Sequence, residues 1–150
     1  TGGRLKRLKK IINNETFHLT YGDGLSNVNI NELLSFHKKN NKIATLTAVR
    51  PIPRFGHITL KDDKVIKFKE KDFLSEGWIN GGFFVLNKKV FNYINDKEDC
   101  IFEREPLENL SKDGELMAYK HEGFWQCMDH KLDKDLLDQM VKEKKAPWIK

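Results

Sequence analysis

Thr16-Phe17-His18-Leu19-Thr20-Tyr21-Gly22-Asp23-Gly24 is the stretch that decides the fold. Its apolar side chains Phe17, Leu19 and Tyr21 fall on one face and its polar ones on the other, which predicts a strand over 16–21. In open α/β sheets, ligands bind beyond the carboxyl ends of the strands, where Asp23 stands here. Two interpretations are open at this point: a plain Asp-Gly turn, or a carboxylate that holds a hard cation such as Mg²⁺.

The composition is that of one globular domain. The chain has 150 residues, of which 39% are hydrophobic and 33% charged, with a net charge of +5. Its lysines are scattered and not interleaved with aromatic residues, so we expect no nucleic-acid partner. No apolar run approaches the roughly 20 residues that span a bilayer, so we expect no membrane insertion. Cys100 and Cys127 lack metal-ligand spacing and fit reduced thiols, which favours a cytoplasmic location.

The predicted helices and strands alternate along the chain. Thr1 is expected to cap a first helix, and Asn31 a second one. Further helices are expected at 88–94, 103–110 and 131–143, and strands at 43–49, 57–60, 65–68, 83–86, 115–119 and 123–128. This order predicts an α/β fold with a mixed, mostly parallel sheet flanked by helices.

A second carboxylate follows a strand in Gly123-Phe124-Trp125-Gln126-Cys127-Met128-Asp129. Asp129 stands directly before the last predicted helix, so one interpretation is a helix N-cap. The other interpretation pairs it with Asp23, because two carboxylates are enough for Mg²⁺ when water and phosphate oxygens complete its shell. Such an ion would neutralise charge during phosphoryl or nucleotidyl transfer.

Three shorter motifs have both a functional and a structural interpretation. Glu70-Lys71 can bind sugar hydroxyls and a phosphate, or be an exposed strand end. Asn80-Gly81-Gly82 can present an amide beside open backbone, or be a β-bulge. Arg54-Phe55-Gly56 can approach a ligand, or be a simple loop.

Several phrases together resemble a known family. They are Thr1-Gly2-Gly3-Arg4-Leu5-Lys6-Arg7, Tyr21-Gly22-Asp23-Gly24, Arg54-Phe55-Gly56, Glu70-Lys71, Ile79-Asn80-Gly81-Gly82-Phe83-Phe84-Val85-Leu86, Glu105-Pro106-Leu107, Gly114-Glu115-Leu116 and the stretch 123–129. In this order they are similar to the sugar-nucleotidyltransferase family, and within it to the glucose-1-phosphate cytidylyltransferases, or CDP-glucose pyrophosphorylases. The resemblance covers almost the whole chain.

The resemblance implies a Rossmann-like fold and the reaction of CTP with glucose 1-phosphate to give CDP-glucose and pyrophosphate. It also implies a homo-oligomer that serves sugar-nucleotide synthesis for lipopolysaccharide O-antigen. The roles it implies are Asp23 and Asp129 as Mg²⁺ ligands, Thr1, Gly2 and Gly3 against the cytosine, and Glu70, Asn80 and Gly81 at the glucose. They also include Lys71 at its phosphate, as a catalytic residue, with Gly56 and Tyr21 as further substrate contacts.

The sequence departs from the family in three places. Asp72 replaces a proline after Glu70-Lys71, and His130 replaces a threonine after Asp129. The family's leading strand and glycine-rich triphosphate loop are not among these 150 residues, so we expect 1–150 to be the C-terminal, sugar-phosphate-binding portion of one domain, inactive alone. The alternatives are a pyrophosphorylase for another nucleotide and a non-catalytic sugar-phosphate-binding or assembly module.

Overall fold

The computed structural model describes residues 1–51, 56–70 and 77–149. They form two compact units, each made of segments that are distant in the sequence. The first contains Thr1–Gly22, Asn29–Thr47 and Gly82–Lys120, and the second contains Asp23–Val28, Ala48–Gly81 and His121–Lys150.

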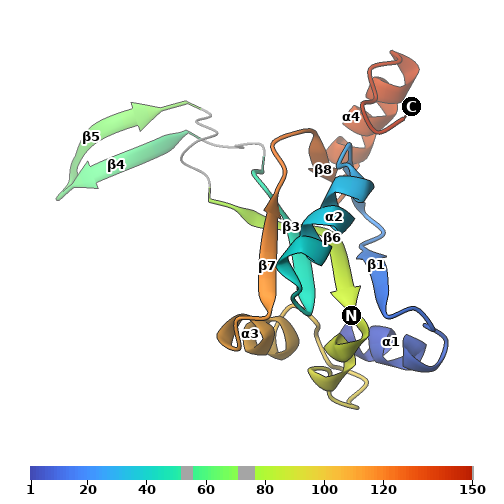
Figure 1. The fold of residues 1–150 in the computed structure, drawn as a ribbon. Coiled ribbons are helices and arrows are strands. Elements are labelled where there is room, and N and C mark those ends of the chain that lie inside the picture. Colours follow the sequence, from blue (N-terminus) through green and yellow to red (C-terminus); the bar gives the residue numbers. More distant parts are fainter. Residues whose placement is uncertain (52–55, 71–76, 150) are drawn as a thin grey trace. The chain divides into compact units, whose positions relative to one another are not determined.

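A four-stranded sheet organises the first unit (Figure 1). Its strand order is β1 (Thr16–Thr20), β6 (Ile79–Asn87), β3 (Ala44–Val49) and β7 (Leu116–Lys120). β1 is antiparallel to β6, with Phe17 opposite Leu86. The Asn87 N–H donates to Ile43 O, so β6 ends where β3 begins, whereas Ala44 N–H donates to Glu115 O beside the start of β7. Three strands therefore run one way and β6 the other, which confirms the predicted mixed sheet.

One face of this sheet carries the core of the unit. The pleat sends Phe17, Phe84 and Leu86 to this face, where Phe17 stacks on Phe91 at 5.9 Å between ring centroids. The helices that close it are α1 (Gly2–Arg7) with the 3₁₀ turn η1 (Leu8–Lys10), the 3₁₀ helix η2 (Lys88–Asn92) and α3 (Glu105–Lys112). Their buried contributions include Leu5, Val90, Leu107 and Leu110.

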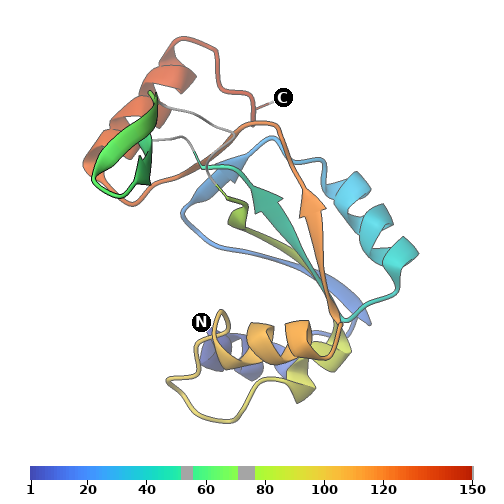
Figure 2. The same ribbon diagram turned by 90° about the vertical axis from the view of Figure 1, so that its left-hand side faces the viewer.

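The opposite face is covered by α2 (Ile30–Asn40), as Figure 2 shows. Leu33 is fully buried there, and His37 Nδ1 lies 2.9 Å from Thr45 Oγ1 on β3. The expected cap of this helix is wrong by two residues: Asn29, not Asn31, accepts hydrogen bonds from the backbone N–H groups of Asn31 and Glu32. Asn31 itself is inside the first turn, where its side chain cannot serve the leading N–H groups.

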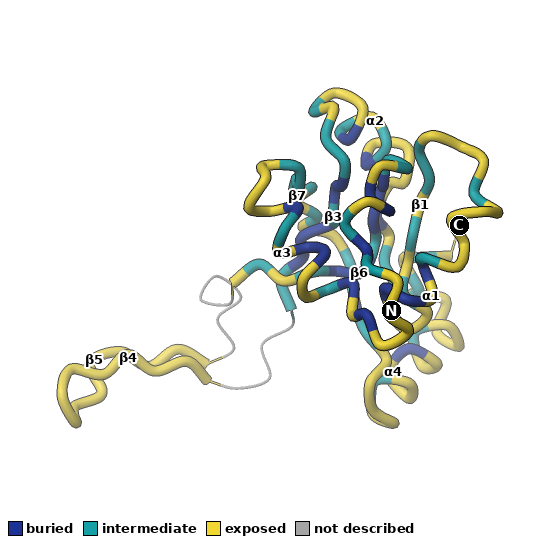
Figure 3. The backbone as a smooth tube through the Cα atoms, turned by 90° about the horizontal axis from the view of Figure 1, so that it is seen from below, coloured by how far each residue is buried: buried dark blue, intermediate teal, exposed yellow. Residues whose placement is uncertain are grey.

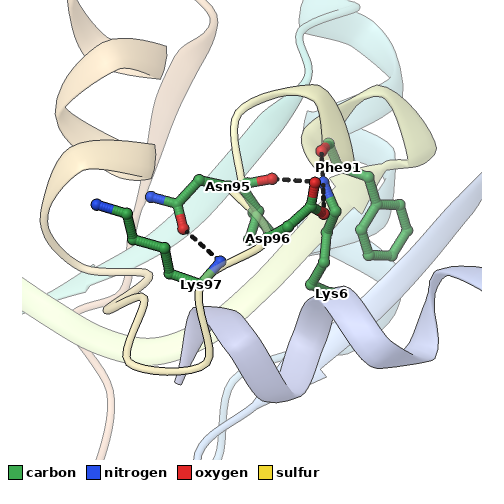
Figure 4. A network of polar contacts seen from close by, with 6 residues as sticks. Lys6, Phe91, Asn95, Asp96 and Lys97 are labelled. Carbon is green, nitrogen blue, oxygen red and sulfur yellow. Dashed lines mark hydrogen bonds and ion pairs between the residues drawn. The ribbon is translucent and has the colours of Figure 1, made fainter.

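Lys6 ties α1 to the end of η2 (Figure 4). Its ammonium donates to Phe91 O at 3.1 Å and to Ile94 O at 2.5 Å, and it pairs with Asp96 at 3.4 Å. These carbonyls lack helical partners because η2 ends there. Lys6 is thus a half-buried structural contact, while Lys9, three residues on, is exposed.

The second unit contains two short antiparallel pairs and a helix. β2 (Gly24–Ser26) pairs with β8 (Trp125–Cys127), and α4 (Lys131–Lys142) follows β8. The strands predicted at 57–60 and 65–68 are confirmed as β4 (His57–Lys61) and β5 (Lys64–Lys69), which pair as an antiparallel hairpin exposed along both strands (Figure 3). Of the helices in the described ranges, none is long and apolar enough to cross a membrane.

Three predicted elements differ in detail. The strand expected at 83–86 is longer and runs from Ile79 to Asn87 through Gly81 and Gly82, although Gly82 has φ +77°. The helix expected at 88–94 is the 3₁₀ helix η2, and α3 begins at Glu105 with Pro106 in its first turn. The predicted α/β architecture is confirmed, with helices on both faces of the sheet.

Candidate active site

Asp23 and Asp129 are brought together by the β2–β8 pair in the second unit. Gly24 is opposite Cys127, and the Met128 N–H donates to Asp23 O at 2.8 Å. Asp23 therefore lies across from Met128, next to Asp129, at one end of the pair. Both residues are exposed, so their carboxylates are accessible to a ligand.

The start of α4 decides between the two interpretations of Asp129. The N-cap residue is His130, and the Asp133 carboxylate accepts from the N–H groups of His130 at 3.0 Å and Asp129 at 3.2 Å. The N-cap interpretation of Asp129 is therefore wrong, because the helix starts one residue later and uses Asp133. His130, which the sequence analysis marked as a departure from the resembling family, therefore stands at this cap.

Asp129 and Asp133 both place negative charge near the thiol of Cys127. Its Oδ2 lies 3.2 Å from Cys127 Sγ. Burial raises the pKa of the Cys127 thiol to about 11, and the hydrogen bond and charge of Asp129, together with the charge of Asp133, add to the effect. A neutral thiol is a poor metal ligand, whereas carboxylate oxygens suit a hard divalent cation. This end of the β2–β8 pair therefore has the donor chemistry of a site completed by water and phosphate oxygens.

The described residues around Asp23 and Asp129 do not form a metal site made only of protein ligands. Within the described ranges, no group of three or more His, Cys, Asp or Glu side chains could hold a metal ion. A two-carboxylate site is the type that Mg²⁺ uses together with substrate phosphates. The donor set fits a nucleotide-bound ion better than a resident structural metal.

The expected sugar-side residues form two separate pairings in the second unit. A Cβ at Gly56 would lie 2.9 Å from Glu70 Oε2, so these two residues face each other where the hairpin begins and ends. Gly81 O accepts from Trp125 Nε1 at 2.8 Å, which joins the start of β6 to β8. Asn80 is half-buried beside Gly81. Lys71 and Asp72 lie outside the described residues, as do Arg54 and Phe55.

The residues expected to contact the nucleotide base, Thr1, Gly2 and Gly3, lie in the first unit, where the two glycines pack against the 98–102 segment. Gly2 and Gly3 are buried, and added Cβ atoms would come to 2.8 Å from Cys100 Sγ and 2.4 Å from Glu98 O. Both glycines are therefore required by their close approach to the 98–102 segment. Their contact with a nucleobase stays a prediction.

Thr1 and Tyr21 meet at a residue that the sequence analysis did not single out. The Glu103 carboxylate accepts hydrogen bonds from the hydroxyl groups of both. Thr1 occupies the N-cap position of α1, but its side chain makes no cap hydrogen bond there. No local pattern marks Glu103, because its partners lie 102 and 82 residues away.

A family model described as nucleotidyl transferase matches residues 4–129 of the chain. The chain belongs to the nucleotidyl transferase family.

Curated relatives of this nucleotidyl transferase agree with that membership. The chain is similar to a probable glucose-1-phosphate cytidylyltransferase of Bacillus subtilis, with 48% identity over 86% of this chain and 50% of the relative. It is also similar to the glucose-1-phosphate cytidylyltransferase of Salmonella typhimurium, with 46% identity over 99% of this chain and 58% of the relative. The chain thus spans 50% to 58% of the length of these two relatives.

Solved structures show the same fold at low sequence identity. HddC from Yersinia pseudotuberculosis matches with a TM-score of 0.68 and 22% identity, over 94% of this chain and 62% of that one. A putative glucose-1-phosphate thymidylyltransferase from Bacillus anthracis matches with a TM-score of 0.67 and 18% identity, over 95% and 61%. The expected fold of a sugar nucleotidyltransferase is confirmed.

Proposed function

We propose that the full-length protein transfers a cytidylyl group from CTP to glucose 1-phosphate, releasing pyrophosphate, and that residues 1–150 supply the sugar-phosphate side of one catalytic domain. Two relatives that are 46% to 48% identical carry the name of this activity. The observation that carries the proposal is the β2–β8 pairing, which sets Asp23 beside Asp129 while Asp133 takes over the capping of α4.

In the proposed reaction, a phosphate oxygen of glucose 1-phosphate attacks the α-phosphorus of CTP. The bond from that phosphorus to the oxygen bridging to the β-phosphate breaks, and its electron pair leaves with pyrophosphate. Asp23 and Asp129 would hold Mg²⁺, which supplies neutralisation of the charge that develops on the phosphate oxygens. Both carboxylates are exposed at the same end of the β2–β8 pair, so an ion held by both would be open to a nucleotide.

The remaining roles follow from side-chain chemistry. Glu70, which faces Gly56, would accept hydrogen bonds from glucose hydroxyls, and the Asn80 amide can both donate to and accept from them. Lys71 would place a positive charge on the sugar phosphate. Thr1, Gly2 and Gly3 would lie against the cytosine.

Pyrophosphate release tests this proposal. The full-length protein is incubated with CTP, glucose 1-phosphate and Mg²⁺, and its rate is compared with those of Asp23→Asn, Asp129→Asn and a control, Asp135→Asn, which removes one exposed charge from α4. We expect a loss of at least about 100-fold for the first two variants, typical of removing a group that stabilises transition-state charge, and little change for the control. An Asp129→Asn variant with the wild-type rate would refute the metal site.

A second candidate function is the same chemistry with another nucleotide. The chain is also 32% identical to the D-glycero-α-D-manno-heptose 1-phosphate guanylyltransferase of Aneurinibacillus thermoaerophilus. The pyrophosphate assay with CTP, UTP, GTP and dTTP separates the two, since CTP is expected to give the highest kcat/KM. If no nucleotide reacts but calorimetry detects glucose 1-phosphate binding, the protein is a non-catalytic binding module instead.

We also propose a cytoplasmic homo-oligomer. The two cysteines, Cys100 and Cys127, are free thiols, as a reducing compartment would keep them. Light scattering after size-exclusion chromatography of the full-length protein would give its mass, and a mass of one chain would contradict the oligomer.

A further inference from the structure

Glu103 joins two segments that are distant in the sequence. Its Oε2 accepts from the Thr1 hydroxyl at 2.5 Å, and its Oε1 accepts from the Tyr21 hydroxyl. Thr1 stands at the start of α1, Tyr21 follows β1, and Glu103 lies two residues before α3. One half-buried carboxylate therefore fixes both hydroxyls, one on each oxygen.

The Thr1 side chain is fully committed to this contact. Its hydroxyl donates to Glu103 and accepts from the Phe102 N–H at 2.9 Å. A threonine at an N-cap usually satisfies the N–H groups of its own helix, but this one contacts the Phe102 backbone and the Glu103 side chain instead. The local cap is given up for a long-range contact, which is what a positioning role would require.

The ionised state of Glu103 suits this role. Burial by itself would raise its pKa, but the hydrogen bonds from Thr1 and Tyr21, a backbone hydrogen bond and the charge of the Thr1 amino group together leave the pKa below its ordinary value. An ionised carboxylate only accepts hydrogen bonds, so both hydroxyls must donate to it and their orientation is defined. A glutamine would keep one acceptor oxygen and turn an NH₂ group toward the other hydroxyl, which could then no longer donate, so the defined orientation of that hydroxyl would be lost.

The same segment also seats the two glycines after Thr1. Gly3 N–H donates to Cys100 O at 3.2 Å, and both glycines approach the 98–102 backbone too closely for a side chain. Residues 98–103 thus support Thr1, Gly2 and Gly3 from one side. Through Glu103 they also hold Tyr21, which lies two positions before Asp23 in the chain.

We propose that Glu103 is a positioning residue that holds Thr1 and Tyr21 in the geometry needed to bind the nucleobase of the nucleotide substrate. This inference rests on the proposed function, because it assigns the nucleobase to Thr1, Gly2 and Gly3. It differs from a purely structural role in one respect: loss of the contact should weaken nucleotide binding selectively and leave sugar-phosphate binding intact.

Steady-state kinetics of the full-length protein test the inference. In Glu103→Gln we expect KM for CTP to rise about tenfold, the typical effect of losing one hydrogen bond to a charged group, with KM for glucose 1-phosphate unchanged. Discrimination between CTP and UTP should fall in parallel. The matched control is Glu105→Gln, two residues on, whose carboxylate accepts only a 3.3 Å contact from Asn95 among its described side-chain partners.

Two further variants keep the test decisive if Glu103→Gln folds poorly. Tyr21→Phe removes one donor and Thr1→Val the other, and each should raise KM for CTP by several-fold. Thr1→Ser retains the hydroxyl and should restore the wild-type value. In a Tyr21→Phe background Glu103→Gln should raise KM for CTP by less than it does in the wild type, since the two changes share the Tyr21–Glu103 contact.

The outcomes separate this inference from the proposed function. An active wild-type protein whose folded Glu103→Gln variant keeps its KM for CTP, or whose two KM values rise equally, would overturn the positioning role alone. A wild-type protein that releases no pyrophosphate from CTP would overturn the proposed function and the inference together. Selective loss of CTP affinity in all the variants that remove a donor or the acceptor would support it.

Discussion

Replacement of Gly82 by alanine should destabilise the protein through its contact with Tyr21. Gly82 is buried in β6 with φ +77°, and an added Cβ would lie 2.6 Å from Tyr21 Cδ2. The left-handed backbone costs an L-residue about 1–2 kcal/mol. Overpacking against the half-buried Tyr21 ring adds about 1–3 kcal/mol, so we expect a total loss of roughly 3 kcal/mol in the free energy of unfolding.

Gly114 provides the matched control for this change. It has φ +68°, but a Cβ there would meet nothing within 4 Å. Gly114→Ala should therefore cost only the backbone strain of about 1–2 kcal/mol. The difference between the two variants, measured by urea unfolding, isolates the steric contact with Tyr21.

A third variant identifies the cause. In a Tyr21→Ala background the ring is gone, so Gly82→Ala should cost no more than Gly114→Ala. Equal losses for Gly82→Ala and Gly114→Ala in the wild-type background would refute the reasoning. So would a cost of Gly82→Ala that is unchanged when the ring is absent.

Three other perturbations address separate contacts. Lys6→Met removes the bonds to Phe91 O and Ile94 O and should cost about 1–3 kcal/mol in urea unfolding, whereas Lys9→Met, at an exposed position, should cost little. Burial, helped by the charge of His18, lowers the pKa of His37 from 6.5, so the unfolded chain takes up protons first and stability should fall as the pH drops below 6.5. His37→Gln should flatten that pH dependence and the exposed His57→Gln should not; an unchanged slope in His37→Gln would contradict the assignment. Asp129→Asn should lower the pKa of Cys127 from about 11 and speed its alkylation by iodoacetamide at pH 9, and an unaltered rate would show that Asp129 does not act on the thiol.

Local patterns predicted most of the elements but not their ends. Alternation over 16–21 gave the strand β1, and the hairpin followed from two alternating runs around Asp62 and Asp63. Cap positions were less accurate: Asn29, not Asn31, caps α2, and His130, not Asp129, is the N-cap of α4. Several capping residues stand close together in each case, and only the backbone geometry decides which of them lies outside the first turn.

From the sequence, the residues of the candidate site could be predicted only where a local motif marks them. The strand-end positions of Asp23 and Asp129 suggested a pair, and the pairing of β2 with β8 puts Asp23 opposite Met128, the residue before Asp129. Glu103 could not be found in this way, because its contacts with Thr1 and Tyr21 arise from packing of distant segments. The structural role of Lys6 was hidden for the same reason, since its partners Phe91, Ile94 and Asp96 are far from it in the sequence.

Binding of Mn²⁺ to the full-length protein, followed by electron paramagnetic resonance in the presence of CTP and without sugar phosphate, tests the central claim most directly. If Asp23 and Asp129 hold one divalent ion, Asp23→Asn and Asp129→Asn should each weaken Mn²⁺ binding by at least about tenfold, the loss of one charged ligand. The Asp135→Asn control should bind as the wild type does. Wild-type affinity in Asp23→Asn or Asp129→Asn would contradict the claim that these two strand-end carboxylates form the metal site.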